Sequence, residues 1–265
     1  MNRIEERLNS LKNRGEKAFI TYVTAGLPSL SDTVSIIKAQ DEAGVDVIEL
    51  GVPFSDPIAD GPVIQAASIE AIKNGTNINK IFEMMRELRK DCQVPVVFML
   101  YYNTINHFGI KKFVETCAEC GVDGLIVPDL PYEESFELKE FLTIPGAPFL
   151  LPLIAPISGD RIPMLLEDAH GFAYCISSMG VTGQDANEFY KNTTDYLDNV
   201  RNISKIPVMM GFGIKEYADV KPYADHIDGC IVGTHLINIM RETNFSLEAI
   251  KNYVSEFKKA LNSGR

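Results

Sequence analysis

Short apolar segments alternate with segments of helical patterning along the whole chain, and this alternation restricts the possible folds more than any other feature. Eight apolar segments are predicted to be strands, at 18–23, 45–51, 94–100, 124–127, 149–153, 172–176, 208–210 and 229–232. Helical patterning follows most of them, at 31–42, 64–73, 78–90, 111–119, 133–142, 161–168, 186–200 and 247–261. Near-continuous apolar strands separated by helices predict a parallel sheet, because parallel strands need crossover connections.

The number of these units favours one closed barrel. Eight strand–helix units in 265 residues indicate a (β/α)8 TIM barrel, of the α/β class, rather than an open doubly wound sheet. Ile4, Leu8 and Leu11 recur at helical spacing within residues 1–17, which predicts an extra helix packed on the barrel. Residues 235–240 predict a short extra helix after the eighth strand. No linker or compositional break divides the chain, so we predict a single domain over residues 1–265.

Composition excludes several classes of protein. The net charge of -11 argues against a nucleic-acid-binding protein, which needs a basic face. No apolar run approaches the roughly 20 residues of a membrane span, and the charged N-terminus lacks a signal peptide's apolar centre. We therefore expect a cytoplasmic protein with no membrane or nucleic-acid partner.

The five cysteines are scattered and odd in number, which is typical of a reducing compartment. Cys117 and Cys120 have the CxxC spacing of a redox or zinc motif. However, no second CxxC or neighbouring histidine pair completes a zinc site, and the two share a predicted helix face with Phe113. We therefore predict buried structural thiols and no metal site.

A lone carboxylate, Glu49, interrupts the second apolar segment. Burying an unpaired carboxylate costs roughly several kcal/mol, so this residue needs either a partner or a catalytic role. The loop that follows is rich in proline and aspartate and ends at Asp60. Active sites of such barrels lie at the C-terminal ends of the strands, where these two acids would meet. The alternative is that Glu49 pairs with a lysine or arginine and the prolines merely shape the loop.

Glycine-bearing segments follow the last three predicted strands, at 180–183, 211–214 and 233–234. Glycine lets backbone amides approach an anion closely, and the last two segments precede possible helix N-termini. Their convergence at successive strand ends predicts a phosphate site, although each glycine alone is equally compatible with a plain turn. The polar loop at 177–192 has the composition of a lid, or of an ordinary surface loop.

Residues 49–62, with the sequence ELGVPFSDPIADGP, resemble the signature of the tryptophan synthase alpha subunit family. The resemblance continues through the three glycine segments and covers essentially the whole chain. It implies a (β/α)8 barrel that cleaves indole-3-glycerol phosphate to indole and glyceraldehyde 3-phosphate, in an α2β2 heterotetramer. It also implies that the chain has no cofactor and that pyridoxal phosphate belongs to the beta subunit.

The resemblance further implies roles for individual residues. Glu49 is expected to be the acid and base, with Asp60 near the indole N–H. Residues expected to bind the substrate are Gly183, Gly213, Gly233 and Thr234 at the phosphate, Tyr22, Leu100, Tyr102, Tyr174 and Phe212 around the indole ring, and also Thr182. Elementary chemistry agrees, because one carboxyl group can both take the hydroxyl proton and protonate indole C3, while a carboxylate stabilises the nitrogen.

The chain departs from the family pattern at two places. Thr234 stands where serine is usual, and it keeps the hydroxyl group. Ser178 and Met179 stand where an arginine and a small residue are common, which leads us to expect altered lid closure and coupling rather than altered chemistry. The open alternatives are another phosphate-binding barrel of the tryptophan pathway, a free-standing lyase, and a mainly regulatory subunit of a beta partner.

Overall fold

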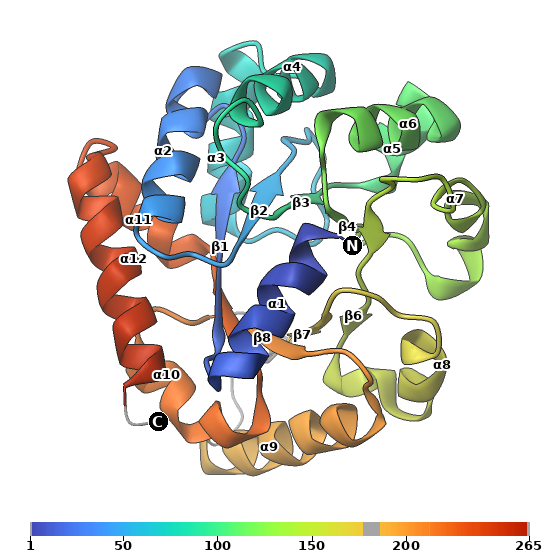
Figure 1. The fold of residues 1–265 in the computed structure, drawn as a ribbon, viewed down its shortest axis with the longest axis vertical. Helices are drawn as coiled ribbons and strands as arrows, with labels where there is room; N and C mark the ends of the chain where they lie inside the picture. The colour runs from blue at the N-terminus through green and yellow to red at the C-terminus, as the bar shows by residue number, and fades with distance from the viewer. Residues whose placement is uncertain (1, 177–185, 212, 264–265) are drawn as a thin grey trace.

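The computed structural model describes residues 2–176, 186–211 and 213–263. A curved sheet of nine parallel strands forms its centre, with helices around the outside (Figure 1). The strands are β1 (Ala18–Thr24), β2 (Val47–Gly51), β3 (Val96–Met99), β4 (Gly124–Ile126), β5 (Phe149–Leu150), β6 (Leu153–Ile154), β7 (Ala173–Ile176), β8 (Val208–Gly211) and β9 (Gly229–Val232). They are ordered β5-β4-β3-β2-β1-β9-β8-β7-β6, and the paired neighbours run parallel, which confirms the predicted parallel sheet.

The strands β5 and β6 are the two halves of one barrel strand, the fifth. The first half pairs with β4 and the second half pairs with β7. Between them, the Leu151 N–H donates to the Leu125 carbonyl at 2.9 Å, and the Pro152 carbonyl accepts from the Tyr174 N–H at 2.9 Å. Proline itself has no N–H to donate. The fifth strand thus joins both edges of the sheet and closes the predicted (β/α)8 barrel.

Helices surround the barrel (Figure 1). The α-helices are α1 (Arg3–Arg14), α2 (Leu30–Glu42), α3 (Pro62–Lys73), α4 (Ile78–Leu88), α5 (Tyr102–Phe108), α6 (Ile110–Cys120), α7 (Phe136–Phe141), α8 (Ile162–Leu166), α9 (Ala186–Ile203), α10 (Tyr217–Val220), α11 (Thr234–Glu242) and α12 (Leu247–Asn262). Short 3-10 helices are η1 (Tyr132–Glu134), η2 (Pro156–Arg161) and η3 (Lys221–His226). We had not predicted α5, because its polar sequence YNTINHF shows no apolar periodicity.

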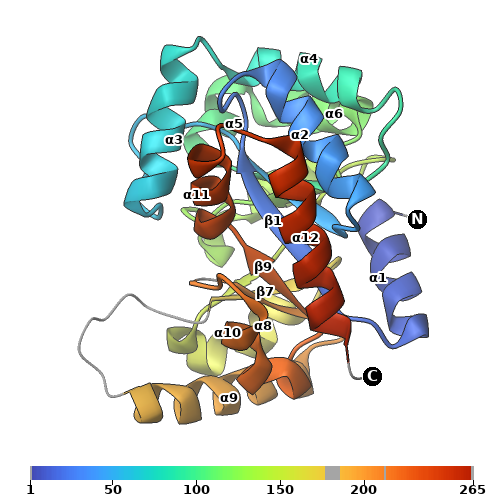
Figure 2. The same ribbon diagram turned by 90° about the vertical axis from the view of Figure 1, so that its left-hand side faces the viewer.

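The predicted N-terminal helix is present as α1. The Asn2 side chain caps it by accepting from the Ile4 N–H at 2.9 Å. The helix lies across the end of the barrel at which the strands begin (Figures 1 and 2). Its apolar face, formed by Ile4, Leu8 and Leu11, packs into the inner core of the barrel. This helix therefore closes the end opposite the expected active site.

Two apolar layers follow from the alternation of side chains along each strand. The inner layer contains Ile20, Val47, Val97, Ile126, Met209 and Ile231 together with α1. The outer layer packs the strands against the helices and contains Ile48, Leu50, Phe98 and Leu125. Glu49 shares the inward parity of Val47, so its carboxyl belongs to the barrel interior.

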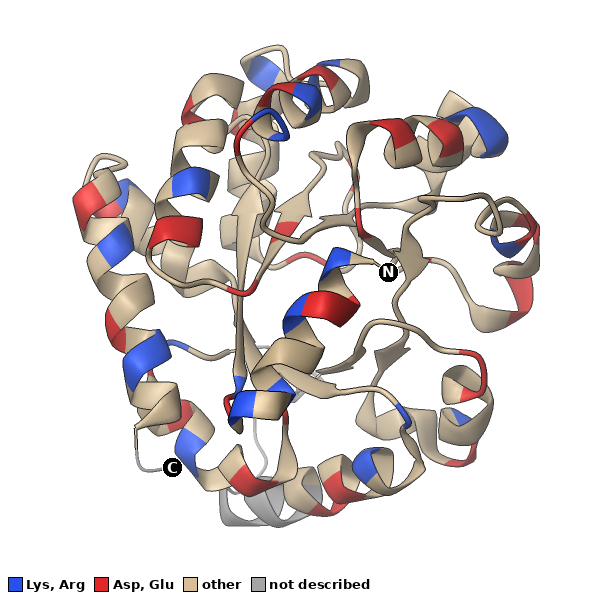
Figure 3. Ribbon diagram, in the orientation of Figure 1, with Lys and Arg blue, Asp and Glu red and all other residues tan. Residues whose placement is uncertain are grey.

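Charged residues lie mainly on the helices and loops, while the strands carry few (Figure 3). Two buried aspartates are paired: Asp123 with Arg3 and Arg89, each at 2.9 Å, and Asp46 with Lys258. In the described ranges, no helix has both the length and the apolar character needed to cross a membrane.

The cysteines are free and buried. Cys117 and Cys120 lie on α6 in the outer core, as predicted. Burial raises the pKa of both thiols, so they stay protonated and act as small apolar side chains.

Candidate active site

A cavity of about 250 Å³ opens at the C-terminal ends of the strands. Its walls come from β1, β2, β3, β7 and β9 and from the segments that follow β8 and β9. The lining residues are Tyr22, Glu49, Met99, Tyr174, Gly213, Ile214, Lys215, Ile231, Gly233, Thr234, His235 and Asn238. Six residues that we had predicted for the site therefore share one cavity: Tyr22, Glu49, Tyr174, Gly213, Gly233 and Thr234.

Glu49 is the buried acid of this cavity, and its residue surface is only 1% exposed. Among the described residues, no group donates a hydrogen bond to its Oε1 atom and no lysine or arginine forms an ion pair with it. Within that part of the chain, the paired-glutamate alternative is therefore wrong. Burial raises the pKa of Glu49 to about 8, so the group holds a proton at neutral pH.

Two tyrosine rings lie beside Glu49, in space that glycines leave open. A Cβ atom on Gly51 would lie 1.9 Å from the hydroxyl oxygen of Tyr22, and one on Gly211 would lie 2.5 Å from that of Tyr174. Both rings are buried, and burial raises the pKa of both hydroxyl groups. They remain neutral and give the cavity two flat aromatic walls.

Asp60 reaches the same end of the barrel on the loop after β2, and Tyr101 anchors that loop. The Ala59 N–H donates to the Tyr101 hydroxyl oxygen at 2.9 Å, and the Phe54 ring stacks on the Tyr101 ring with centroids 5.0 Å apart. Burial raises the pKa of Asp60, and the nearby Tyr101 hydroxyl partly opposes the rise. Both Asp60 and Glu49 lie near enough to Tyr22 to affect its titration.

The structure does not bring Leu100 and Tyr102 to the cavity, although we had predicted both there. Leu100 is 1% exposed and packs in the outer core, while Tyr102 begins α5 and its hydroxyl lies 3.4 Å from Glu137 on α7. Successive strand residues point to opposite faces. The inward positions are therefore those of Met99, which lines the cavity, and Tyr101, which holds the acidic loop.

The glycine segments after β8 and β9 converge at the cavity. Gly213 has a φ of 76°, a left-handed conformation that glycine adopts without strain. Gly233 is the N-cap of α11, which confirms the short extra helix, and Thr234 is its first residue. The unpaired N–H groups at such a helix start can bind an anion.

Several predicted residues lie outside the described residues. They are Thr182, Gly183 and Phe212, together with Ser178, Met179 and most of the predicted lid at 177–192. Their assigned roles therefore stay predictions.

The prediction from sequence also missed cavity residues. Ile231 and Gly233 are two positions apart, so strand alternation could have identified Ile231 as a neighbour of the phosphate segment. Lys215 and His235 each directly follow a predicted glycine segment, and this position next to the segment could have indicated that they line the cavity. Asn238 lies one helical turn beyond Thr234 and had no signal of its own.

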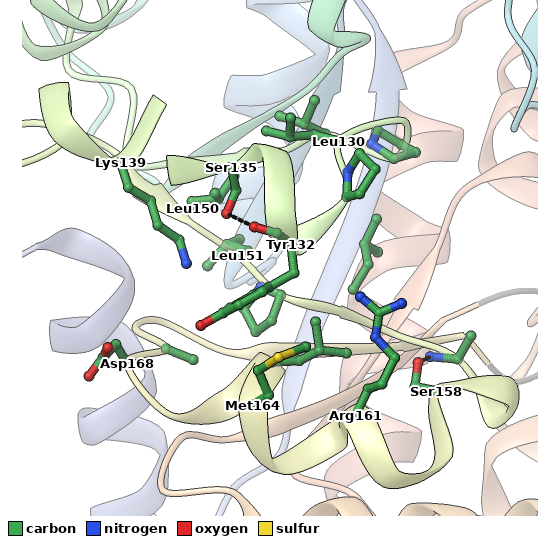
Figure 4. A pocket seen from close by; sticks show the side chains of 18 of the residues that line it. Leu130, Tyr132, Ser135, Lys139, Leu150, Leu151, Ser158, Arg161, Met164 and Asp168 are labelled. Atoms are coloured by element: carbon green, nitrogen blue, oxygen red, sulfur yellow. Dashed lines mark hydrogen bonds between the residues drawn. The ribbon is translucent and has the colours of Figure 1, made fainter. Parts of the chain in front are cut away.

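A second cavity, of about 360 Å³, lies over the fifth barrel strand between α7 and α8 (Figure 4). The Tyr132 ring lies between Lys139 and Met164, with the Lys139 amine 4.5 Å from the ring centroid. Arg161 pairs with Glu133 at 2.6 Å. The walls of this second cavity are largely apolar and include no buried carboxyl group. The buried carboxyl group of Glu49 lines the other cavity.

The cavity at the strand ends combines a buried, protonated carboxyl group, a second carboxyl on the neighbouring loop and the start of a helix. Within the ranges that the structure describes, no cluster of three or more His, Cys, Asp or Glu side chains could hold a metal ion. The fold and this site define a (β/α)8-barrel enzyme with acid–base groups at its strand ends.

Comparison with known proteins identifies the family. The family model of the tryptophan synthase alpha chain matches residues 8–263. The tryptophan synthase alpha chain of Lachnospira eligens is 57% identical over 265 residues, which cover 99% of this chain and 100% of that one. That of Alkaliphilus metalliredigens is 41% identical over 268 residues, 100% of both chains. The crystal structure of tryptophan synthase subunit alpha from Legionella pneumophila has a TM-score of 0.89 and 32% identity, with 98% of each chain covered. The chain belongs to the tryptophan synthase alpha chain family.

This membership confirms the resemblance found in residues 49–62. The chain is a carbon–carbon lyase of tryptophan biosynthesis, which cleaves indole-3-glycerol phosphate to indole and glyceraldehyde 3-phosphate. Its partner is a tryptophan synthase beta subunit.

Proposed function

We propose that Glu49 and Asp60 carry the cleavage in this chain, Glu49 as acid and base and Asp60 as the stabilising carboxylate. The observation that carries this proposal is the burial of Glu49 beside an open cavity, without an ion-pair partner in the described residues. A fold that leaves a carboxyl group in this state loses stability, which is understandable where the group has a catalytic task.

The raised pKa of Glu49 suggests the order of proton transfers. The protonated carboxyl gives its proton to indole C3, and positive charge develops at the indole nitrogen, where Asp60 stabilises it. The resulting Glu49 carboxylate takes the proton from the adjacent glycerol hydroxyl. That oxygen forms the aldehyde carbonyl, the bond to C3 breaks, and its electron pair restores the indole ring. Glu49 ends protonated, so one residue completes the cycle.

Substrate orientation comes from both ends of the cavity. Gly213, Gly233 and Thr234 are proposed to bind the phosphate through backbone amides and the threonine hydroxyl. Tyr22 and Tyr174 are proposed to face the indole ring, with Met99 in the position first assigned to Leu100. Holding the reacting atoms in place contributes to the rate alongside the proton transfers.

The remaining expectations belong to the same proposal. One barrel domain acts in the cytoplasm without a metal or organic cofactor, and pyridoxal phosphate is confined to the beta subunit. Acid–base chemistry of this kind needs no further group, because every proton released at one step is consumed at another.

An indole-release assay on indole-3-glycerol phosphate tests the assignment. Glu49→Gln keeps the side-chain shape but cannot transfer the proton, so we expect a loss of turnover of about 10²-fold or more. Asp60→Asn should also lower turnover severely. Each variant is measured with and without a beta subunit, with circular dichroism to confirm folding. Turnover of a folded Glu49→Gln protein within several-fold of the parent would remove Glu49 from the mechanism.

A further inference from the structure

We propose that Lys215 supplies a positive charge to the phosphate subsite, so that this chain binds its substrate through an ammonium group as well as through backbone amides. The inference rests on the proposed function, which puts the phosphate between the segments after β8 and β9. Lys215 lies two residues after Gly213 and lines the same cavity as Gly233 and Thr234.

The charges around the cavity give this lysine a specific role. Among the described residues that line it, Lys215 is the only lysine or arginine, and the lining carboxyl is that of Glu49. Asp60 lies on the neighbouring loop, and the whole chain has a net charge of -11. A phosphate dianion therefore approaches a predominantly acidic protein. One cation at the cavity offsets part of that repulsion and raises the local concentration of the anionic substrate.

The backbone of Lys215 is fixed from two sides. Its N–H donates to the Asp219 carboxylate at 2.9 Å, at the start of α10, and its carbonyl accepts from the Tyr253 hydroxyl of α12 at 2.7 Å. The same Tyr253 ring contacts His235 edge-to-face, with centroids 5.5 Å apart.

The side chain of Lys215, in contrast, is exposed to solvent. No carboxylate of the described residues forms an ion pair with its ammonium group. Lys215 thus lines the cavity with a fixed backbone, and its ammonium group, which has no ion-pair partner among the described residues, is available to an incoming anion.

The test compares three variants in the presence of the beta subunit. Lys215→Gln removes the charge, Lys215→Arg keeps it, and Lys221→Gln removes one charge from an exposed lysine outside the cavity. We expect Lys215→Gln to raise KM for indole-3-glycerol phosphate about tenfold with little change in kcat. Lys215→Arg should restore most of the affinity, and Lys221→Gln should behave as the parent.

Two further readouts separate a direct charge effect from a structural one. The inhibition constant of inorganic phosphate should rise in Lys215→Gln, while binding of uncharged indole stays unchanged. The rise of KM with added salt should also be shallower in this variant, because one charge has left the site. Equal values for Lys215→Gln and Lys221→Gln would overturn the proposal. A parent protein that inorganic phosphate does not inhibit competitively would instead contradict the phosphate subsite itself.

Discussion

Glu49 differs from the other buried carboxylates of this chain in having no cationic neighbour among the described residues. Asp46 and Asp123 are fixed by lysine or arginine side chains, and they stabilise the end of the barrel near α1. Glu49 faces the opposite end and remains protonated instead. At the scale of single residues, Asp46 and Asp123 are therefore structural acids, whereas the carboxyl group of Glu49 is free to take part in chemistry.

The raised pKa of Glu49 predicts a pH-dependent stability difference. Burial raises this pKa from its ordinary value of 4.5 to about 8. Between these values the folded protein holds a proton that the unfolded chain releases, so rising pH favours unfolding. Glu49→Gln lacks this dependence. Its free energy of unfolding, relative to the parent, should therefore increase from pH 5 to pH 8, by at most about 1.4 kcal/mol per pH unit.

Urea unfolding of both proteins at pH 5 and at pH 8 measures this difference. Parallel pH profiles for parent and variant would show that Glu49 titrates near its ordinary value in the folded protein.

Gly51 provides a second prediction at this scale. A Cβ atom there would lie 1.9 Å from the Tyr22 hydroxyl oxygen, so Gly51→Ala must displace the ring. We expect a loss of about 1–3 kcal/mol of stability and a large drop in lyase turnover, since the displaced ring enters the cavity. Gly61→Ala is the matched control, because a Cβ atom on Gly61 meets nothing within 4 Å. Thermal unfolding and indole release would measure both effects, and equal losses in the two variants would contradict the packing argument.

At the scale of elements, α1 shows how a surface helix contributes to the barrel core. Ile4 packs where two strands begin, close to Gly124 and Gly171. Replacing it by alanine leaves a cavity that neither glycine can fill, so Ile4→Ala should cost about 2–5 kcal/mol. Asn9→Ala on the exposed face of the same helix should change stability by less than about 0.5 kcal/mol. Denaturant unfolding of both variants checks this, and a small loss for Ile4→Ala would mean that α1 is only loosely attached.

The elements also show what the sequence could predict and what it could not. Near-continuous apolar runs and helical periods revealed all eight barrel strands and most of the helices, because burial imposes those patterns directly. The extra helix α11 was predicted from the glycine segment at 233–234 that precedes it. The same patterns missed α5, whose polar residues carry no periodic signal, and the break at Pro152. The family resemblance assigned Leu100 and Tyr102 to the cavity, whereas the inward parity at the end of β3 belongs to Met99 and Tyr101.

At the scale of the whole molecule, the end of the barrel that holds the cavity carries an exposed apolar residue that a partner could cover. The loop that bears Asp60 also presents Ile58, which is 82% exposed, and it lies at the same end as the cavity. A beta subunit that orders this loop would fix Asp60 against the substrate and exclude water.

We therefore predict that the isolated chain is a slow lyase and that its beta subunit accelerates it tenfold or more, or by at least about 1.4 kcal/mol in the barrier. Because Ser178 stands where the family commonly has arginine, this activation should be weaker than is usual for the family. Steady-state indole release during titration with the beta subunit measures it. A fast isolated chain that does not respond to the partner would instead favour a free-standing lyase.

The divided fifth strand also affects how fast the backbone amide hydrogens of the barrel exchange with solvent. Two residue pairs join it to each neighbour, whereas β1 and β2 share five. Its residues are mostly half-buried under short helices, while every residue of β1 is buried. Transient opening of the fifth strand therefore needs less free energy than opening of β1, because fewer backbone hydrogen bonds break and less apolar surface is exposed. In heavy water, deuterium should replace the amide hydrogens of the fifth strand well before it reaches those of β1.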